Sequence, residues 1–359
     1  PAAGGARAWK ADWLASRIEA RDATTLAAWD AARADMARVV AAVEAAPDAA
    51  FGPPEVLAPF QRAPFATSFD LAAQPQDESL RVNQLLNAAL DAALSQDRGV
   101  HLIGEDIADG YGGAFKVTLG LSTRHPGRVF STPISEAASV GLANGRALSG
   151  ARPVVEIMFG DFVTLAADQL INQAAKTWFM YDRKASMPLT LRLVSGGYRG
   201  YGATHSQSLE QLFCGVPGLR VLAISRRHAA GAMLRAAIDD PNPVLFVENK
   251  ILYTQRPLSA PAAGFEARPV AASADAPYPP LMFSSAPPGG AADVTLVTYG
   301  GMTGLCEDAM QTLLLRSEID FDYFILSDIS APAHAAIAAS LARTGRLVVV
   351  EEGHTALGV

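Results

Sequence analysis

The chain is poor in cysteine, in long apolar runs and in positive charge. Two cysteines, Cys214 and Cys306, cannot form a disulfide framework or a zinc site of several thiolates, so we expect both to be buried apolar side chains. No apolar run approaches the roughly 20 residues that a membrane helix needs, and no signal peptide is visible. The net charge of −7 argues against binding nucleic-acid phosphates. We therefore expect a cytoplasmic protein with no membrane or nucleic-acid partner.

Several catalytic signatures are also missing. No two of the six histidines stand at metal-ligand spacing, and the sequence contains no His-Glu-x-x-His motif. There is no Walker loop, no Gly-x-Ser-x-Gly elbow and no Gly-x-Gly-x-x-Gly after a predicted strand. The motif search therefore gives no support to a zinc protease, a P-loop nucleotidase, a serine hydrolase or a Rossmann dehydrogenase.

The chain nevertheless has the material for sizeable cores, since half of its 359 residues are hydrophobic. Helical periodicity marks the leader, and closely spaced prolines forbid regular structure in the connector that follows. Strands and helices then alternate in two segments, with an irregular stretch between them. The predicted parts are a helical leader (1–50), a connector (51–78), an α/β domain (79–254), an irregular linker (255–291) and a second, incomplete α/β domain (292–359).

Alternation of strands and helices predicts a mainly parallel sheet with helices on both faces. In the first domain we expect strands over 100–103, 128–131, 153–157, 189–193, 220–224 and 244–247. Its expected helices are 80–95, 136–149, 164–181 and 228–238. In the second domain we expect strands over 294–298, 323–326 and 347–350, and helices over 303–316 and 333–343.

Polar and aromatic groups follow the predicted strands, where open α/β sheets bind ligands. Glu105 follows the first strand, Glu136 the second, Phe162 the third and His205 the fourth. A carboxylate, an aromatic ring and an imidazole can therefore meet in one cleft. From spacing alone, other readings stay open: Glu136 as a carboxylate stabilised by a helix dipole, His205 as a structural histidine and Phe162 as a core residue.

Several motifs occur in the order found in one enzyme family. They are GEDI (104–107), GAFKVT (113–118), TPISE (132–136), RPVVEI (152–157), DQ (168–169), NQAAK (172–176), THSQS (204–208) and PGL (217–219). With them, residues 80–254 resemble the β subunit of the thiamine-diphosphate-dependent E1 component of 2-oxo acid dehydrogenases. Residues 292–359 resemble the first part of its C-terminal domain, and 9–60 resemble the tail of the partner α subunit.

The resemblance implies roles for individual residues. Glu136 would hydrogen-bond N1′ of the cofactor's pyrimidine, which favours the imino tautomer that removes the C2 proton. An apolar pocket would raise the pKa of that carboxyl. Phe162 would pack on the pyrimidine, and Glu105 and Ile134 would also contact the cofactor. His205 would act near the reacting centre in acyl transfer to lipoamide.

The resemblance also implies metals and partners. Mg²⁺ and the diphosphate would be held mainly by an α-type domain, because the family's Gly-Asp-Gly motif with a distal Asn is absent here. That domain would lie on another chain or on a missing part. An α2β2-like oligomer and a lipoyl domain of a carrier protein are the other expected partners. A structural K⁺ site is implied at Leu189, Thr190, Ala237, Asp240 and Asn242.

Three functions compete on this evidence. The favoured hypothesis is an E1 enzyme that decarboxylates a 2-oxo acid and acylates a lipoyl group. A second is a transketolase-like or acetoin-type enzyme that passes a two-carbon unit to an aldehyde or carrier. A third is a scaffold that keeps the fold without catalysis. Because the chain opens on Pro1 and stops just after a predicted strand, we expect it to be part of a longer, fused α–β polypeptide.

Overall fold

The computed structural model describes residues 76–272 and 276–358, with Arg62, Ala63, Phe65 and scattered helical positions between 27 and 41. The predicted leader helices and most of the proline-rich connector lie outside the described residues. Within the described ranges, no helix combines the length and apolar character needed to cross a membrane. The two sheets described below both belong to the part of the chain that follows residue 58.

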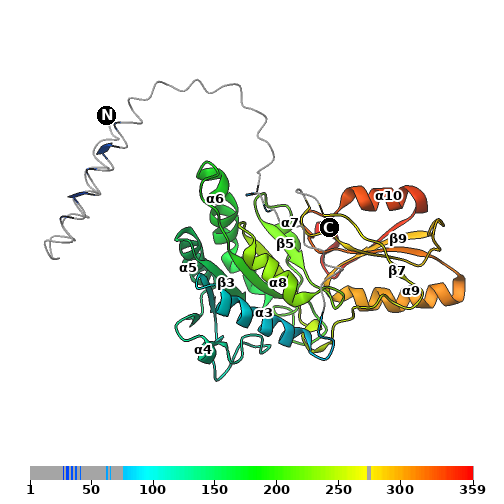
Figure 1. The fold of residues 1–359 in the computed structure, drawn as a ribbon, viewed down its shortest axis with the longest axis horizontal. Coiled ribbons are helices and arrows are strands. Elements are labelled where there is room, and N and C mark those ends of the chain that lie inside the picture. Colours follow the sequence, from blue (N-terminus) through cyan, green and yellow to red (C-terminus); the bar gives the residue numbers. More distant parts are fainter. Residues whose placement is uncertain are drawn as a thin grey trace. The chain divides into compact units, whose positions relative to one another are not determined.

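The first sheet has six strands in the order β2-β1-β3-β4-β6-β5 (Figure 1). Every neighbouring pair is parallel, as the sequence predicts. Each predicted strand is present, with ends shifted by two residues at most. The strands are β1 Val100–Gly104, β2 Val129–Ser131, β3 Arg152–Ile157, β4 Thr190–Ser195, β5 Arg220–Ala223 and β6 Val244–Asn249.

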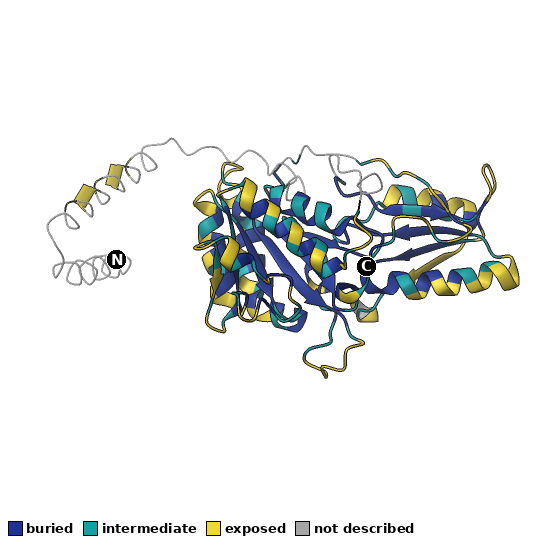
Figure 2. Ribbon diagram, turned by 60° about the horizontal axis from the view of Figure 1, so that its bottom comes forward, coloured by how far each residue is buried: buried dark blue, intermediate teal, exposed yellow. Residues whose placement is uncertain are grey.

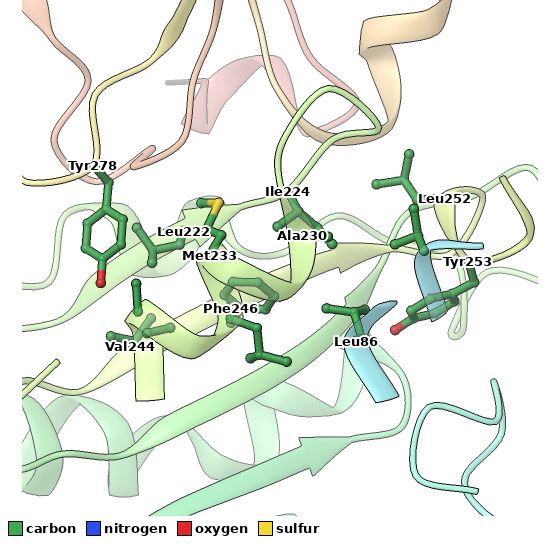
Figure 3. Close-up of a cluster of buried hydrophobic side chains, with 14 of the residues drawn as sticks. Leu86, Leu222, Ile224, Ala230, Met233, Val244, Phe246, Leu252, Tyr253 and Tyr278 are labelled. Carbon is green, nitrogen blue, oxygen red and sulfur yellow. The ribbon is translucent and has the colours of Figure 1, made fainter. Parts of the chain in front are cut away.

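Alternating side chains bury both faces of this sheet. Figure 2 shows its strands mostly in the colour of buried residues. In β6, for example, Phe246 joins one hydrophobic cluster, whereas its neighbours Leu245 and Val247 join the other. The first cluster lies under α3 (Val82–Gln96) and α8 (Ala230–Asp239), which pack on each other. Figure 3 shows its centre, where Leu86 of α3, Met233 of α8, Phe246 and Tyr253 come together. A two-sided core of this kind holds the strand ends rigidly.

The opposite face is covered by α5 (Glu136–Leu148) and by residues 160–180. The helix predicted over 164–181 is present as a continuous helical run, but its hydrogen bonding changes along its length. The structure has a 3₁₀ turn (Gly160–Ala166), a π-helical segment (Gln169–Ala174) and then α6 (Ala175–Met180). Asn144 of α5 donates from Nδ2 to the Gln169 carbonyl at 3.0 Å. Insertion of a side chain into the helical hydrogen-bond ladder is a recognised cause of such a change.

A second sheet follows, with strand order β11-β9-β10-β8-β7. Its strands β9 (Val294–Thr298), β10 (Phe321–Ile325) and β11 (Leu347–Val350) are parallel, and β8 (Leu281–Ser284) runs antiparallel to β10. Helices α9 (Thr303–Ser317) and α10 (His334–Thr344) lie on opposite faces (Figure 1). The second α/β domain of the predicted fold class is therefore confirmed. The remaining short elements are α4 (Leu121–Arg124), α7 (Gln211–Cys214) and β7 (Glu266–Ala267).

The stretch between the two alternating segments differs from its prediction. It is not irregular throughout, because it supplies β7 and β8 to the second sheet. Proline and glycine dominate its composition, but Leu281, Met282 and Phe283 form a short apolar run that pairs with β10. A run of that length between breakers is ambiguous in sequence, and its pairing partner lies about 40 residues downstream.

The two sheets are joined by backbone hydrogen bonds and an ion pair. The amide of Ala223 donates to the Ser327 carbonyl at 2.8 Å, and Ile329 donates to the Val221 carbonyl at 2.9 Å. At the start of β5, Arg220 contacts Asp328 at 2.8 Å. The edge strand β5 of the first sheet is therefore firmly attached to the second domain.

A buried charge cluster crosses the middle of the first sheet. Arg192 of β4 hydrogen-bonds Glu156 of β3, and it reaches both carboxylate oxygens of Glu248 in β6 at 2.7 Å. The hydroxyl of Tyr253 donates to Glu248 at 2.6 Å. Burial raises the pKa of Glu156, and the positive charge of Arg192 opposes that rise. Each charge in this cluster has a partner, as a buried ion needs.

Gly218 makes an unusually close backbone contact. Its φ of +90° lies in the left-handed region, and an added Cβ would stand 2.0 Å from the carbonyl oxygen of Ala175. Only glycine fits such a position, because any side chain would collide with the backbone of α6. The loop before β5 and the first turn of α6 are thus packed main chain against main chain.

Candidate active site

The strand order determines how the sequence-predicted site residues are arranged. Glu136 follows β2, Glu105 follows β1, Phe162 follows β3 and His205 follows β4. Because β2, β1, β3 and β4 are consecutive neighbours, the four residues lie in that order along the carboxyl edge of the sheet. This is the edge at which parallel α/β sheets bind ligands.

Glu136 is the first residue of α5, as the sequence analysis expected for the start of a helix. Ser135 caps the helix, since its hydroxyl accepts a hydrogen bond from the Ala138 amide at 3.3 Å. The Glu136 side chain is 7 % exposed, and no described residue donates a hydrogen bond to its carboxylate. The helix N-terminus offers only partial positive charge. A buried carboxyl without a protein donor is suited to a ligand that supplies one.

Glu105 lies beside Glu136 and belongs to the same site. Its Oε1 accepts a hydrogen bond from the Ser135 amide at 3.0 Å. Burial raises the pKa of Glu105, the charge of Glu136 raises it further, and the Ser135 hydrogen bond opposes both effects. The Glu105 carboxyl is therefore easier to protonate than an ordinary glutamate side chain. The adjacent Ile134 side chain is 85 % exposed, so an apolar surface stands next to this pair.

Phe162 and His205 contact each other, as the sequence analysis anticipated. Their ring centroids are 5.1 Å apart in an edge-to-face arrangement. The Nδ1 atom of His205 is 3.0 Å from the Thr204 hydroxyl. Both rings are half-buried, which leaves a face of each open to a bound molecule.

Phe159 is the centre of this aromatic group, and the sequence analysis did not single it out. Its ring lies 4.8 Å from His205, 5.5 Å from Tyr201 and 5.9 Å from Phe115. Phe115 stands in the loop after β1, the strand that Glu105 also follows. One signal was present in the sequence: Phe159, Tyr201 and Phe115 each follow a predicted strand within the motif-bearing loops.

The site residues thus form two neighbouring groups. Glu105, Glu136 and Ile134 gather at the start of α5, and Phe162 and His205 gather around Phe159. The described hydrogen bonds and ring contacts bring no atom of Glu136 against His205. The two groups occupy adjacent stretches of one edge, with β1 and β2 supplying the carboxylates and β3 and β4 the rings.

The residues of the predicted K⁺ site lie at the opposite edge of the sheet. All are buried, and the Thr190 hydroxyl donates to the Ala237 carbonyl at 3.0 Å. The Leu189 carbonyl accepts from the Val244 amide. Asp240 contacts Arg220 at 3.0 Å and also accepts two hydrogen bonds from Asn242. The side-chain carboxylate is thus already neutralised by protein donors, so these side chains do not fit a cation-binding role.

Metal-ligating clusters and reactive thiols give no competing site. The described residues contain no group of three His, Cys, Asp or Glu side chains placed to hold a metal ion. Cys306 is buried as predicted, whereas Cys214 is only partly buried. Burial raises the pKa of Cys214 to about 12, so this side chain stays a thiol at neutral pH and is a poor nucleophile.

Comparisons with known proteins bear directly on the site. The family described as "Transketolase, pyrimidine binding domain" matches residues 78–256. A mitochondrial pyruvate dehydrogenase E1 subunit β-2 from Oryza sativa is 37 % identical over 290 residues, covering 79 % of this chain and 72 % of the relative. The β subunit of an acetoin:2,6-dichlorophenolindophenol oxidoreductase from Cupriavidus necator is 35 % identical, covering 76 % and 79 %.

Solved structures agree on the fold. A split-gene transketolase, described as an inactive β4 tetramer, aligns with a TM-score of 0.58 at 17 % identity, over 78 % of this chain and 82 % of that one. Transketolase from Leishmania mexicana aligns with a TM-score of 0.55 at 15 % identity, over 80 % and 41 %. Sequence identity and shared length with the pyruvate dehydrogenase subunits establish the relationship. The chain belongs to the thiamine-diphosphate-dependent E1 β-subunit family, with its transketolase-like pyrimidine-binding domain.

Proposed function

We propose that this chain is the pyrimidine-binding half of an E1-type 2-oxo acid dehydrogenase, which decarboxylates a 2-oxo acid and acylates a lipoyl group. The observation that carries the proposal is the Glu136 carboxyl: it is buried at a helix N-terminus, receives no hydrogen bond from the described residues and stands beside an exposed apolar side chain. Thiamine diphosphate, when bound, supplies the carbanion chemistry of the reaction.

Glu136 would hold the aminopyrimidine of the cofactor and keep a proton shared with the ring. Glu105 supports this role in two ways. It fixes the turn before α5 through the Ser135 amide, and its own pKa is raised by burial and by the charge of Glu136, so it can carry a proton beside the cofactor site. Ile134 would present an apolar contact to the cofactor, excluding water from the carboxyl group.

Phe162 would contact the cofactor, and His205 would act on the substrate side of the site. The half-buried Phe162 ring offers an apolar face for the pyrimidine, and its edge-to-face contact fixes the position of His205. An imidazole is suited to move a proton near neutral pH. We therefore assign His205 to proton transfer during acyl transfer to the lipoyl group.

The other half of the site would come from an α-type domain that holds the diphosphate and Mg²⁺. This follows from the absence in this sequence of the family's diphosphate motif. An α2β2-like assembly has a surface available for it: Leu142, Leu148, Met180 and Tyr181 are 51, 49, 54 and 55 % exposed on the helices that flank the sheet. Large exposed apolar side chains of this kind mark subunit interfaces.

Two inferences from the family remain predictions. The K⁺ ion would need main-chain carbonyls alone, because the Asp240 carboxylate is already paired. A cytoplasmic location is also a prediction; the plant relative is named as a mitochondrial protein.

An acetoin-type activity is the second candidate, supported by the 35 % identity to the Cupriavidus necator subunit. Both candidates require the same residues at the pyrimidine, so the donor molecule separates them. The chain should be assembled with its α-type partner and supplied with Mg²⁺ and thiamine diphosphate. Separate incubations would contain 2-oxo acids, acetoin or ketose phosphates, each with a lipoylated domain or an artificial electron acceptor.

The expected result is decarboxylation of a 2-oxo acid together with acylation of the lipoylated domain. Turnover of acetoin or a ketose phosphate, with none of any 2-oxo acid, would overturn the proposal in favour of the alternative. Failure of the assembled, Mg²⁺-supplied protein to bind thiamine diphosphate, measured by calorimetry, would support a non-catalytic scaffold instead.

A further inference from the structure

Lys250 lies buried behind the aromatic group and has no assigned role. It follows β6, its side chain is 0 % exposed, and its ammonium has no hydrogen-bond partner among the described residues. The ammonium is 5.6 Å from the centroid of the Phe159 ring, within the range of a cation–π contact. Burying an ammonium without a hydrogen bond is costly, so the position needs an explanation.

One connection runs from Lys250 through a ring to the site. The Phe159 ring contacts the Lys250 ammonium, and its centroid is 4.8 Å from the centroid of the His205 ring. The Phe159 ring also contacts Phe162 and Tyr201. A charge held against this ring therefore restrains the ring against which His205 packs.

A second connection runs through a carboxylate. Asp161 is buried, and its Oδ1 accepts hydrogen bonds from the Gln207 side chain at 2.7 Å and from the Gln207 amide at 3.3 Å. Its other oxygen, Oδ2, has no hydrogen-bond partner among the described residues. Burial lowers the pKa of Lys250, and the charge of Asp161 is foremost among the carboxylates that oppose this. Gln207 stands two residues after His205, so this connection ends on the same loop.

The main chain of Lys250 is anchored independently of its side chain. Its amide donates to the Ser195 carbonyl at 2.9 Å, and its carbonyl accepts from Arg199 at 3.3 Å. A substitution of the side chain therefore leaves the backbone contacts in place. The contribution of the ammonium can be tested by itself.

We propose that Lys250 is a positioning residue whose ammonium, held against the Phe159 ring, fixes loop 204–208 and thereby orients His205. The inference rests on the role proposed above for His205 and adds a residue to it.

Lys250→Met tests the role because it keeps the length of the side chain and removes the charge. In the complex with the α-type partner, we expect kcat for lipoyl acylation to fall about 10- to 100-fold, the scale of a small misplacement of a reacting group. KM for the 2-oxo acid should stay within about twofold, since Glu136 and the cofactor half are untouched. Lys250→Arg should restore most of kcat.

Lys184→Met is the matched control. The Lys184 side chain is 79 % exposed and pairs with Asp182 on the surface. It lies outside the loops 159–162 and 196–208 that carry the aromatic group and His205. Its substitution should leave kcat and KM unchanged. Equal kcat values for Lys250→Met and the wild type would overturn the proposal.

A second readout does not depend on catalysis. Hydrogen exchange of the chain without its partner should show faster exchange in Lys250→Met confined to amides 196–208, with a melting temperature that does not fall. If Lys250→Met does not fold, Asp161→Asn removes the carboxylate charge while keeping an acceptor for Gln207, and it should loosen the same amides. Unchanged exchange in the folded variant would refute the role. An inactive wild type would instead refute the proposed function.

Discussion

Charged side chains of the first sheet behave differently in its middle and at its carboxyl edge. In the middle, Arg192 is bound to Glu156 and Glu248, and a tyrosine hydroxyl completes the cluster. At the edge, the Glu136 carboxylate and the Lys250 ammonium have no hydrogen-bond partner in the described part of the chain. The comparison separates charged side chains that stabilise the fold through ion pairs from charged side chains that are available to bind a ligand or to position a loop.

The largest effect on stability should come from the middle of the sheet. Arg192→Met leaves two buried carboxylates facing each other, and we expect it to lower the free energy of unfolding by about 3–5 kcal/mol. Urea denaturation followed by circular dichroism measures this. Arg235→Met is the control, because Arg235 pairs with Asp239 four residues later on a partly exposed helix surface, where such a pair contributes about 0.3–0.5 kcal/mol. Equal losses in both variants would remove the distinction.

At the edge, the loss should appear in catalysis and not in stability. Glu136→Gln should lower turnover by about 10²–10⁴, the usual contribution of a general acid–base group. Its melting temperature should match the wild type, since no described donor bonds to the carboxylate. Steady-state kinetics and thermal melting measure the two quantities. Glu318→Gln, on the exposed surface of the second domain, should change neither. Normal turnover in Glu136→Gln would reject the assignment.

A smaller effect should follow from the aromatic side of the edge. Phe162→Ala removes a ring contact of the kind that contributes about 0.5–1.5 kcal/mol. We therefore expect the affinity of the assembled protein for thiamine diphosphate to weaken by about tenfold at most, measured by calorimetry. Phe162→Tyr keeps the ring and should bind as the wild type does. An affinity unchanged by the alanine substitution would place Phe162 outside the cofactor contact.

The smallest expected effect concerns the stability contribution of Glu210, a buried carboxyl that has hydrogen-bond donors but no ion-pair partner among the described residues. Glu210 accepts hydrogen bonds from Ser195 and Tyr299, and burial raises its pKa. A carboxyl whose pKa is raised on folding lowers stability once the pH exceeds its unfolded value, about 4.3. Glu210→Gln should therefore be slightly more stable than the wild type near pH 8. Denaturation at several pH values should show this difference vanish as the pH falls toward 4.

The same contrast explains how much the sequence predicted. The strand positions were predicted accurately because Val- and Leu-rich runs buried on both faces are local signals in the sequence. The position of Glu136 at the start of a helix was also predicted from local sequence. The contact of Phe162 with His205 followed from placing both after neighbouring strands. Phe159 and Lys250 were missed because their roles depend on contacts between β3, β4 and β6, which no single segment displays.

Two local misreadings have physical causes as well. Residues 164–181 have a continuous helical pattern, and the π-helical segment within this run begins at Gln169, whose carbonyl accepts a hydrogen bond from Asn144 on another helix. The strands β7 and β8 escaped notice because breakers surround them and their pairing is with distant residues. In both cases a tertiary contact accompanies the backbone conformation.

Gly218 has a consequence that reaches beyond its own loop. Its bare Cα lets the turn before β5 touch the main chain of α6, whose end carries the exposed Met180. Even a methyl group at 218 would push that helix outward and tilt the surface proposed to receive a neighbouring subunit. The absence of a side chain at position 218 would thus help to set how two protomers fit together. An alanine at this position would change the packing of α6 and, with it, the surface proposed to contact a neighbouring subunit.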